Sequence, residues 1–399
     1  MGSIMAQQRV YLDNHATTPV DPRIFNAMAP FFTEIYGNPA SKNHSFGSEA
    51  KDAVDAARRQ IAGLIGAQPK EIIITSGATE SNNLAIKGVA EAAAAGGVAE
   101  RNHIVTLTTE HKAVLDPCQR LELSRFAVTY LKVQENGLVN MDELYTATHE
   151  KTLLVSVMHA NNEIGVIQPM AEIGAFCRQN GIVFHVDAAQ SIGKIPVDVT
   201  AMNIDLLSIS AHKIYGPKGI GALFVRSGKP RLELRPQMDG GGHERGFRSG
   251  TLPTPLIVGL GLACELAGGE MASEAAALGG LRQKLLDGIM AGLDHVTING
   301  DMEQRLPGNL NLTFKDVEAE SLLQRIPHIA LSTGSACTTA NLEPSHVLKA
   351  LGLRHEAALS SVRFGLGRFT TEEEVETVVE AVVQAVTSLR ASALISNIS

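Results

Sequence analysis

Short apolar runs alternate with helical stretches through the first 225 residues, and this order constrains the fold more than any other feature of the chain. The expected strands are rich in β-branched residues and cover residues 71–75, 104–107, 127–131, 153–158, 181–187, 206–210 and 221–225. Apolar strands in alternation with helices are typical of an α/β fold, in which helices cover both faces of a mostly parallel sheet.

Polar residues follow five of these expected strands. They lie at 76–79, 110–111, 159–163, 187–190 and 210–213. In an open sheet of parallel strands, ligands gather at the carboxyl ends of the strands. The sequence therefore predicts that these five groups of residues form one site.

Lys213 is the most unusual residue of this set, because it follows an apolar strand and precedes a Gly-Pro turn. Ammonium groups are strongly hydrated, whereas a lysine that forms an imine needs a site that favours its neutral amine. On this segment alone, a surface lysine that extends its charge into water is the simpler interpretation, as we expect for Lys218. The neighbouring motifs favour the reactive lysine.

An aromatic aldehyde with a ring nitrogen and a phosphate would explain these residues together. Lys213 would form an imine with it. The turn at Ala78 and Thr79 would hold the phosphate at a helix N-terminus, helped by Ser210 and His212. An ordinary N-cap explains the turn equally well when it is taken alone.

Three other polar residues fit the same ligand. Asp187 ends an apolar strand and would pair with a protonated ring nitrogen, which keeps the ring able to accept electrons. Gln190 would bind the ring hydroxyl, and His111 would stack on the opposite face and move protons. Each residue alone has a structural explanation, but their shared position at strand ends favours a site.

The second half of the chain has a different character. A Gly-rich loop is expected over 236–254, and a long alanine-rich helix over 255–293. Strands near 296–298 and 309–314, a helix through Leu322, a loop over 333–340 and a final helix from Glu372 predict a smaller α+β unit. We expect a large unit over 20–265 and a small unit made of 1–19 and 266–399.

The composition excludes several classes of protein. The chain has 399 residues, 44% of them hydrophobic, and its net charge of −8 argues against nucleic acid as the main ligand. Neither a leader peptide nor a segment long and apolar enough to span a membrane is expected, which favours the cytoplasm. The four cysteines are Cys118, Cys177, Cys264 and Cys337. They form no CxxC pair, so neither a disulfide framework nor a zinc cluster is indicated.

Seven motifs resemble those of the cysteine desulfurases, in the NifS/IscS group of pyridoxal-phosphate enzymes and closer to its IscS branch. They read TSGATES at 75–81, TEHKAV at 109–114, MHANNEIG at 158–165, HVDAAQ at 185–190, SAHK at 210–213, GGGHER at 240–245 and GSACT at 334–338. The resemblance extends from Tyr11 to Glu374. It implies the aminotransferase-like fold of fold-type I pyridoxal-phosphate enzymes.

The resemblance also implies roles for individual residues. Lys213 would carry pyridoxal 5'-phosphate, and Cys337 would take sulfur from L-cysteine, which leaves L-alanine and an enzyme persulfide. With His111 they make up the implied catalytic set. The implied cofactor contacts are Ala78, Thr79, Asn162, Asp187, Gln190, Ser210, His212, Lys213 and Thr251. The implied substrate contacts are Asn38, Asn162 and Arg363.

Two of these residues carry further expectations. Thr251 resembles a residue that reaches the phosphate of the neighbouring subunit's cofactor, which implies a homodimer. Arg363 resembles the arginine that holds the substrate carboxylate, for which a guanidinium fork is suited; a structural ion pair is the alternative for this residue.

Cys337 lies among small polar residues, so we expect it to be accessible and mobile. A free thiol with a pKa of about 8.5 is mostly protonated at neutral pH and needs activation. The resemblance implies sulfur transfer to an IscU-like iron–sulfur scaffold protein. Other sulfur acceptors, such as a protein relay for tRNA thiolation, stay open. Apart from transient ligation of an iron–sulfur cluster by Cys337, no metal site is expected.

Two segments depart from the family. Residues 1–8 match no part of its pattern, and the chain ends at Ser399, before the longer tail with which the IscS branch docks the scaffold protein. Two other functions stay open: another pyridoxal-phosphate enzyme of this fold, such as an aminotransferase or a selenocysteine lyase, and a non-catalytic assembly platform. An aminotransferase has no need of Cys337, and a platform has no need of Lys213.

Overall fold

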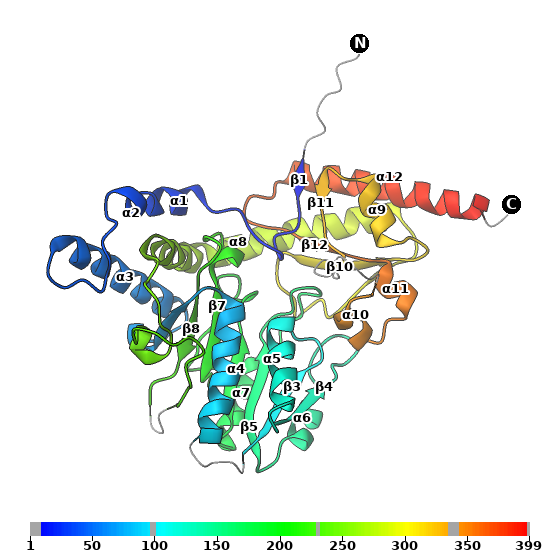
Figure 1. The fold of residues 1–399 in the computed structure, drawn as a ribbon. Coiled ribbons are helices and arrows are strands. Elements are labelled where there is room, and N and C mark those ends of the chain that lie inside the picture. The colour runs from blue at the N-terminus through cyan, green and yellow to red at the C-terminus, as the bar shows by residue number, and fades with distance from the viewer. Residues whose placement is uncertain (1–8, 96–100, 229–231, 334–342, 397–399) are drawn as a thin grey trace.

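The larger part of the molecule is built on a seven-stranded sheet (Figure 1). The computed structural model describes residues 9–95, 101–228, 232–333 and 343–396. From edge to edge the strands are β2 (Ile72–Thr75), β8 (Gly221–Val225), β7 (Leu206–Ser210), β6 (Val183–Asp187), β5 (Thr152–Met158), β3 (His103–Leu107) and β4 (Ala127–Leu131).

This sheet confirms the predicted architecture. β4, β3, β5, β6 and β7 pair in parallel, and β8 runs antiparallel to both β7 and β2. The carboxyl ends of β2, β5, β6 and β7 therefore face the same edge of the sheet. Because consecutive side chains of a strand point to opposite faces, Ile72 and Ile74 pack into one hydrophobic cluster and Ile73 into another.

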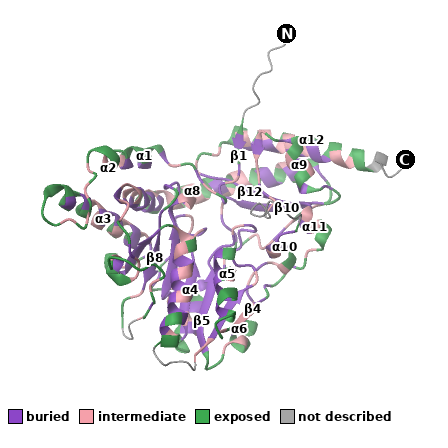
Figure 2. Cartoon of the chain, in the orientation of Figure 1, coloured by how far each residue is buried: buried purple, intermediate pink, exposed green. Residues whose placement is uncertain are grey.

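Helices cover both faces of the sheet, which explains why its strands are apolar on both sides (Figure 2). On one face α4 (Ala78–Ala95) and α5 (Lys112–Glu122) supply Leu84 and Val114 to the core. The opposite face is covered by α3, α6, α7 and part of α8. Their bounds are Ser45–Leu64 for α3, Met141–Ala147 for α6, Met170–Gln179 for α7 and Thr254–Gly292 for α8.

A third hydrophobic cluster forms around a smaller, three-stranded antiparallel sheet in the order β12-β10-β9. Val10 of β1 and the second half of α8 also belong to this cluster. The remaining elements of this part are β1 (Val10–Tyr11), β9 (Val296–Ile298), β10 (Asn309–Phe314), α9 (Ala319–Arg325), β11 (Ile329–Ala330), β12 (Ser361–Gly365) and α12 (Glu372–Ser396).

Two short helices of the C-terminal half pack elsewhere. α10 (His346–Ala350) and α11 (His355–Leu359) contribute Val347, Leu348 and Ala358 to the core of the large sheet. β1 also pairs in parallel with β11, a contact that the sequence did not predict.

The expectation that no segment has the length and hydropathy of a membrane span is wrong for α8. This helix of 39 residues contains a window of mean hydropathy 1.4. Its residues Ile257 and Leu260 lie in the core of the large sheet, and Leu285 and Ile289 lie in the core of the small one. Part of the apolar surface of α8 thus packs inside the protein, against α3 and α12, with 39% of the apolar window buried.

The N-terminal helix is also shorter than expected. Asp21 and Pro22 predict the start of a single helix that runs through Ile24, Met28 and Phe32, but the structure has α1 (Pro22–Met28) and a separate turn of helix, α2 (Pro30–Thr33). Pro30 lacks the N–H that a continuous helix would need at this position. Phe32 consequently lies exposed rather than on a buried face.

Candidate active site

A cavity of about 530 Å³ lies at the carboxyl ends of the strands of the large sheet, beside the start of α4. Most of the residues predicted from the sequence line it, so the strand ends do meet at one site. These residues are Ala78, Thr79, His111, Asn162, Asp187, Gln190, Ser210, His212, Lys213 and Arg363. The lining also includes His15 and Asn82, which the sequence pattern did not indicate.

Lys213 lies one turn beyond the strand end where the sequence placed it. β7 ends at Ser210, and Lys213 is the last residue of a single 3₁₀ turn, η2 (Ala211–Lys213). Its Nζ donates hydrogen bonds to the carbonyl oxygens of His15, at 2.5 Å, and Ala16, at 2.7 Å. The half-buried amine is therefore held at the cavity wall, whereas Lys218 is exposed.

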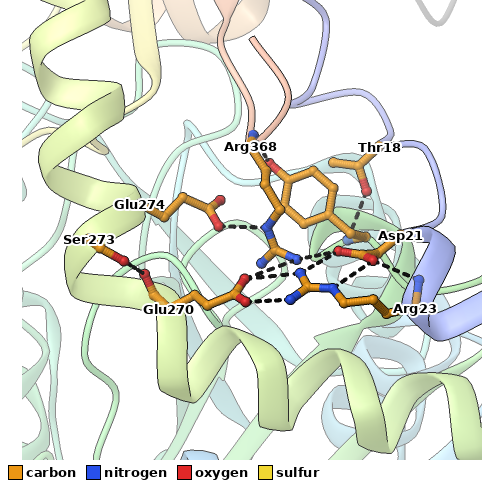
Figure 3. A network of polar contacts seen from close by, with 8 residues as sticks. Thr18, Asp21, Arg23, Glu270, Ser273, Glu274 and Arg368 are labelled. Carbon is orange, nitrogen blue, oxygen red and sulfur yellow. Dashed lines mark hydrogen bonds and ion pairs between the residues drawn. The ribbon is translucent and has the colours of Figure 1, made fainter. Parts of the chain in front are cut away.

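The segment that follows Lys213 is fixed by a polar network (Figure 3). Tyr215 has a φ of 64°, which is uncommon for a residue with a side chain, and its carbonyl oxygen accepts a hydrogen bond from the N–H of Asp21. The Arg368 guanidinium lies 4.3 Å from the centre of the Tyr215 ring and donates to Asp21 and Glu274. The N-terminal segment, α8 and the segment after β12 are thus joined beside the lysine.

The turn between β2 and α4 leads directly into a helix N-terminus, the local geometry that the predicted phosphate site requires. Gly77 adopts a φ of 146°, which other residues rarely adopt, and the N–H groups of the first turn of α4 follow it directly. Ser210 and His212 lie on the adjoining turn. His212 Nδ1 contacts Thr17 Oγ1 at 3.1 Å, and burial lowers the pKa of its ring to about 4. These donors fit a phosphate group at the N-terminus of α4.

Asp187 is a buried carboxylate at the end of β6. Its Oδ2 accepts a hydrogen bond from Asn82 Nδ2 at 2.7 Å, and its Oδ1 accepts one from the N–H of Ala189 at 2.9 Å. Both donors are neutral, so a protonated ring nitrogen would supply the cation that a buried carboxylate favours. Asn82 lies one helical turn after Ala78, and this spacing is the signal that could have placed it at the site.

Two neighbouring residues of the TEH motif differ in their surroundings. Glu110 is fully buried, its Oε1 accepts a hydrogen bond from the N–H of Met158 at 2.9 Å, and burial raises the pKa of its carboxyl well above the usual value. His111 caps α5 by accepting a hydrogen bond from the N–H of Ala113 at Nδ1. Burial lowers the pKa of His111, so the neutral ring carries its proton on Nε2.

Gln190 is held by two residues that sequence analysis did not single out. Its Oε1 lies 3.1 Å from Lys194 Nζ and 3.1 Å from His15 Nδ1, and its Nε2 donates to the carbonyl oxygen of His15 at 2.9 Å. Lys194 follows Gln190 by four residues, a spacing that indicates proximity only if the segment turns like a helix. His15 is 175 positions away, and no local pattern predicts the contact.

Arg363 lines the cavity and also forms the ion pair that was the alternative for this residue. Its Nη2 lies 2.6 Å from Asp13 Oδ1, and its Nη1 donates to the carbonyl oxygen of Asn162 at 3.0 Å. The buried Nε has no hydrogen-bond partner among the described residues. The guanidinium is thus oriented by the protein and keeps a donor for a ligand.

Three predicted residues are not placed in this cavity. Asn38 lies exposed between α2 and α3, where its Oδ1 accepts from the N–H of Ala40 at 2.9 Å. Thr251 is exposed in the Gly-rich loop. Cys337 lies outside the described residues. The other cysteines, Cys118, Cys177 and Cys264, are buried, and burial raises the pKa of each thiol to about 12.

The Gly-rich loop is anchored within its own chain more firmly than the sequence suggests. Glu244 pairs with Arg58 and accepts a hydrogen bond from the N–H of Ile74 at 2.7 Å. Arg248 pairs with Glu80 at 2.8 Å, at the start of α4. These contacts fix the loop against β2 and α4.

Comparisons with known proteins agree with this site. Residues 10–378 match the family model of class-V aminotransferases. The chain is 57% identical to cysteine desulfurase IscS of Aeromonas salmonicida (strain A449), over 96% of this chain and 93% of that protein. It is 56% identical to a mitochondrial cysteine desulfurase of Arthroderma benhamiae, over 96% of this chain and 75% of that protein.

Solved structures give the same result. A NifS-like protein superposes with a TM-score of 0.88 at 38% identity, over 95% of this chain and all of that one. A structure described as SspA in complex with cysteine superposes with a TM-score of 0.80 at 39% identity, over 91% of this chain and all of that one.

The fold and the site are those of a class-V aminotransferase, the α/β architecture of fold-type I that binds pyridoxal 5'-phosphate. Within this class, the chain belongs to the cysteine desulfurases, which are pyridoxal-phosphate enzymes, and is similar to their IscS branch.

Proposed function

We propose that this enzyme takes sulfur from free L-cysteine onto Cys337 as a persulfide, releases L-alanine, and delivers the sulfur to iron–sulfur cluster assembly in the cytoplasm. The placement of Lys213, Asp187, His111 and Arg363 around one cavity is the observation that carries this proposal. The volume of this cavity suits a pyridoxal cofactor joined to a small amino acid.

The proposed roles follow from the contacts at the site. Bound pyridoxal phosphate supplies an electron sink that weakens bonds at the substrate's amino-bearing carbon. Lys213 attaches this group and Asp187 faces its ring nitrogen. The N–H groups at the start of α4 hold its phosphate, together with Thr79, Ser210 and His212.

Substrate contacts are proposed for three other residues of the cavity lining: Arg363, Asn162 and His111. Arg363 binds the carboxylate of cysteine through donors that Asp13 and Asn162 already orient. Asn162 supports both the substrate and the cofactor. His111 presents its Nε2 proton to the cavity and exchanges protons with the substrate.

The destination of the sulfur can be measured with labelled cysteine. The purified enzyme is incubated with labelled L-cysteine and an iron–sulfur scaffold protein, and the label is followed on both proteins. We expect label first on Cys337 and then on the scaffold, and tRNA-thiolation proteins serve as alternative acceptors. Label that stays on the enzyme with every acceptor contradicts the proposed delivery.

A homodimer is the proposed assembly, with a second copy of this chain as the partner. Four aromatic side chains are exposed along α1, α2 and the start of α3: Phe25, Phe32, Tyr36 and Phe46. An exposed apolar surface of this kind is typical of an interface. Thr251 and Asn38 also lie outside the cavity of their own chain, which agrees with sites completed across two subunits.

Light scattering tests this assembly, and a fully active monomer at working concentration contradicts it. Phe32→Glu places a charge on the aromatic surface and is expected to weaken the dimer. Leu123→Glu, at an exposed apolar residue of the distant α5 end, is the matched control.

We also infer the division into a large unit, 20–265, and a small unit, 1–19 with 266–399. Separate hydrophobic clusters support it, although α10 and α11 pack on the large core. Stepwise proteolysis that releases a stable large fragment tests the boundary.

A further inference from the structure

Lys194 is a lysine behind the active site for which the mechanism above has no use. It lies in the turn segment after β6, and its Nζ donates a hydrogen bond to Gln190 Oε1 at 3.1 Å. Although the residue as a whole is partly exposed, its ammonium end is desolvated. Burial, followed by the charge of Lys213, lowers the pKa of Lys194 to about 7.

The contacts of Lys194 determine which way the Gln190 amide faces. A lysine ammonium is only a donor, so the atom of Gln190 next to it must be the oxygen. His15 Nδ1 contacts the same oxygen at 3.1 Å, and Gln190 Nε2 donates one hydrogen to the carbonyl oxygen of His15. The second hydrogen on Nε2 is left for the cavity, which Gln190 lines together with Asp187.

His15 joins this group to a second, smaller cavity. Burial lowers the pKa of His15 well below the usual value, so the ring is neutral and its proton lies on Nδ1, toward Gln190. Its Nε2 is buried without a hydrogen-bond partner among the described residues. His15 and Lys194 both line a cavity of about 20 Å³, which has room for one water. The group is thus a built polar cluster at the back of the active site.

We propose that Lys194 is a positioning residue for the bound cofactor: it fixes Gln190 so that an N–H faces the ring oxygen, and its charge stabilises that oxygen as an anion. This inference rests on the proposed contact between Gln190 and the cofactor. A neutral side chain at position 194 would remove the charged donor to the amide oxygen. Only the two contacts with His15 would then oppose a rotated amide that presents its oxygen to the anionic ring oxygen and repels it.

The charges around Lys194 agree with this role. Lys213 of η2 and Arg363 of β12 repel its ammonium, and Glu274 of α8 attracts it. Glu274 also accepts a hydrogen bond from Arg368 Nε at 2.8 Å, so its charge is shared (Figure 3). When Lys213 is joined to the cofactor and the linkage is deprotonated, its nitrogen carries no charge, which removes one repulsion and favours the charged form of Lys194.

The test is a pH titration of the cofactor-loaded enzyme, followed by the visible absorbance of the Lys213–cofactor linkage. A positive charge near this linkage disfavours its protonated form. Lys194→Met is therefore expected to raise the pKa of the linkage by about 1, and Lys194→Arg to keep it near that of the parent. Lys151→Met removes an equal charge from an exposed lysine that does not line the cavity and is expected to change it less.

A second comparison separates positioning from charge alone. Lys194→Met is repeated in a Gln190→Ala background, where a smaller shift is expected because the amide is absent. An equal shift in both backgrounds, or none in either, overturns the inference. Gln190→Ala alone is expected to raise the pKa of the linkage; if it has no effect, the proposed contact between Gln190 and the cofactor fails as well.

Discussion

Glu163 gives the clearest prediction about stability. It belongs to the NNEIG motif, is buried, and accepts a hydrogen bond from Ser345 Oγ at Oε2. Burial raises the pKa of its carboxyl from 4.5 to about 7, against a smaller opposing effect of Arg363. The folded protein thus keeps this proton at pH values at which the unfolded chain has already released it.

The sign and size of the effect follow from this difference. Stability falls as the pH rises wherever the folded state binds more protons than the unfolded state, here between about 4.5 and 7. At about 1.4 kcal/mol for each pKa unit, the raised pKa of Glu163 costs about 3 kcal/mol above pH 7. Glu163→Gln keeps an acceptor for Ser345 and has no proton to lose. It should therefore match the parent near pH 4 and be more stable by up to about 3 kcal/mol at pH 8.

Urea unfolding of the purified full-length enzyme at a series of pH values measures this difference. Glu150→Gln, at an exposed position, is the control and should follow the parent across the whole range. Curves for the parent and Glu163→Gln that run parallel from pH 5 to 8 would refute the reasoning.

Three other predictions concern the chemistry. Lys213→Ala should lose covalent cofactor and all turnover, and borohydride-reduced cofactor on Lys218 would contradict the assignment. Cys337→Ser should bind cysteine and change the cofactor spectrum, yet release essentially no alanine, because water is a poor substitute for a positioned thiolate; alanine formation at the parental rate would place the nucleophile elsewhere. Arg363→Met should lower kcat/KM for cysteine by roughly 10- to 150-fold, the loss of a charge-assisted hydrogen bond of about 1.5–3 kcal/mol; an unchanged kcat/KM would leave Arg363 with only its ion pair to Asp13.

The sequence by itself determined the sheet and most of the cavity. Apolar β-branched strands in alternation with helices form a parallel sheet, and such a sheet places its strand ends at one edge whatever the loops between them. Residues at strand ends, such as Asp187 and the turn at Ala78, were therefore predictable from local pattern alone.

Tertiary structure decided the contacts that hold these residues in place. Arg363 meets Asp13 across 350 positions, His15 meets Gln190 across 175, and Asn82 meets Asp187 across 105. No local periodicity encodes such pairs, because they depend on how the N-terminal segment and the small sheet pack on the large one. Because of the same packing, α8, apolar enough for a membrane, contributes to one hydrophobic cluster of the large sheet and to that of the small sheet.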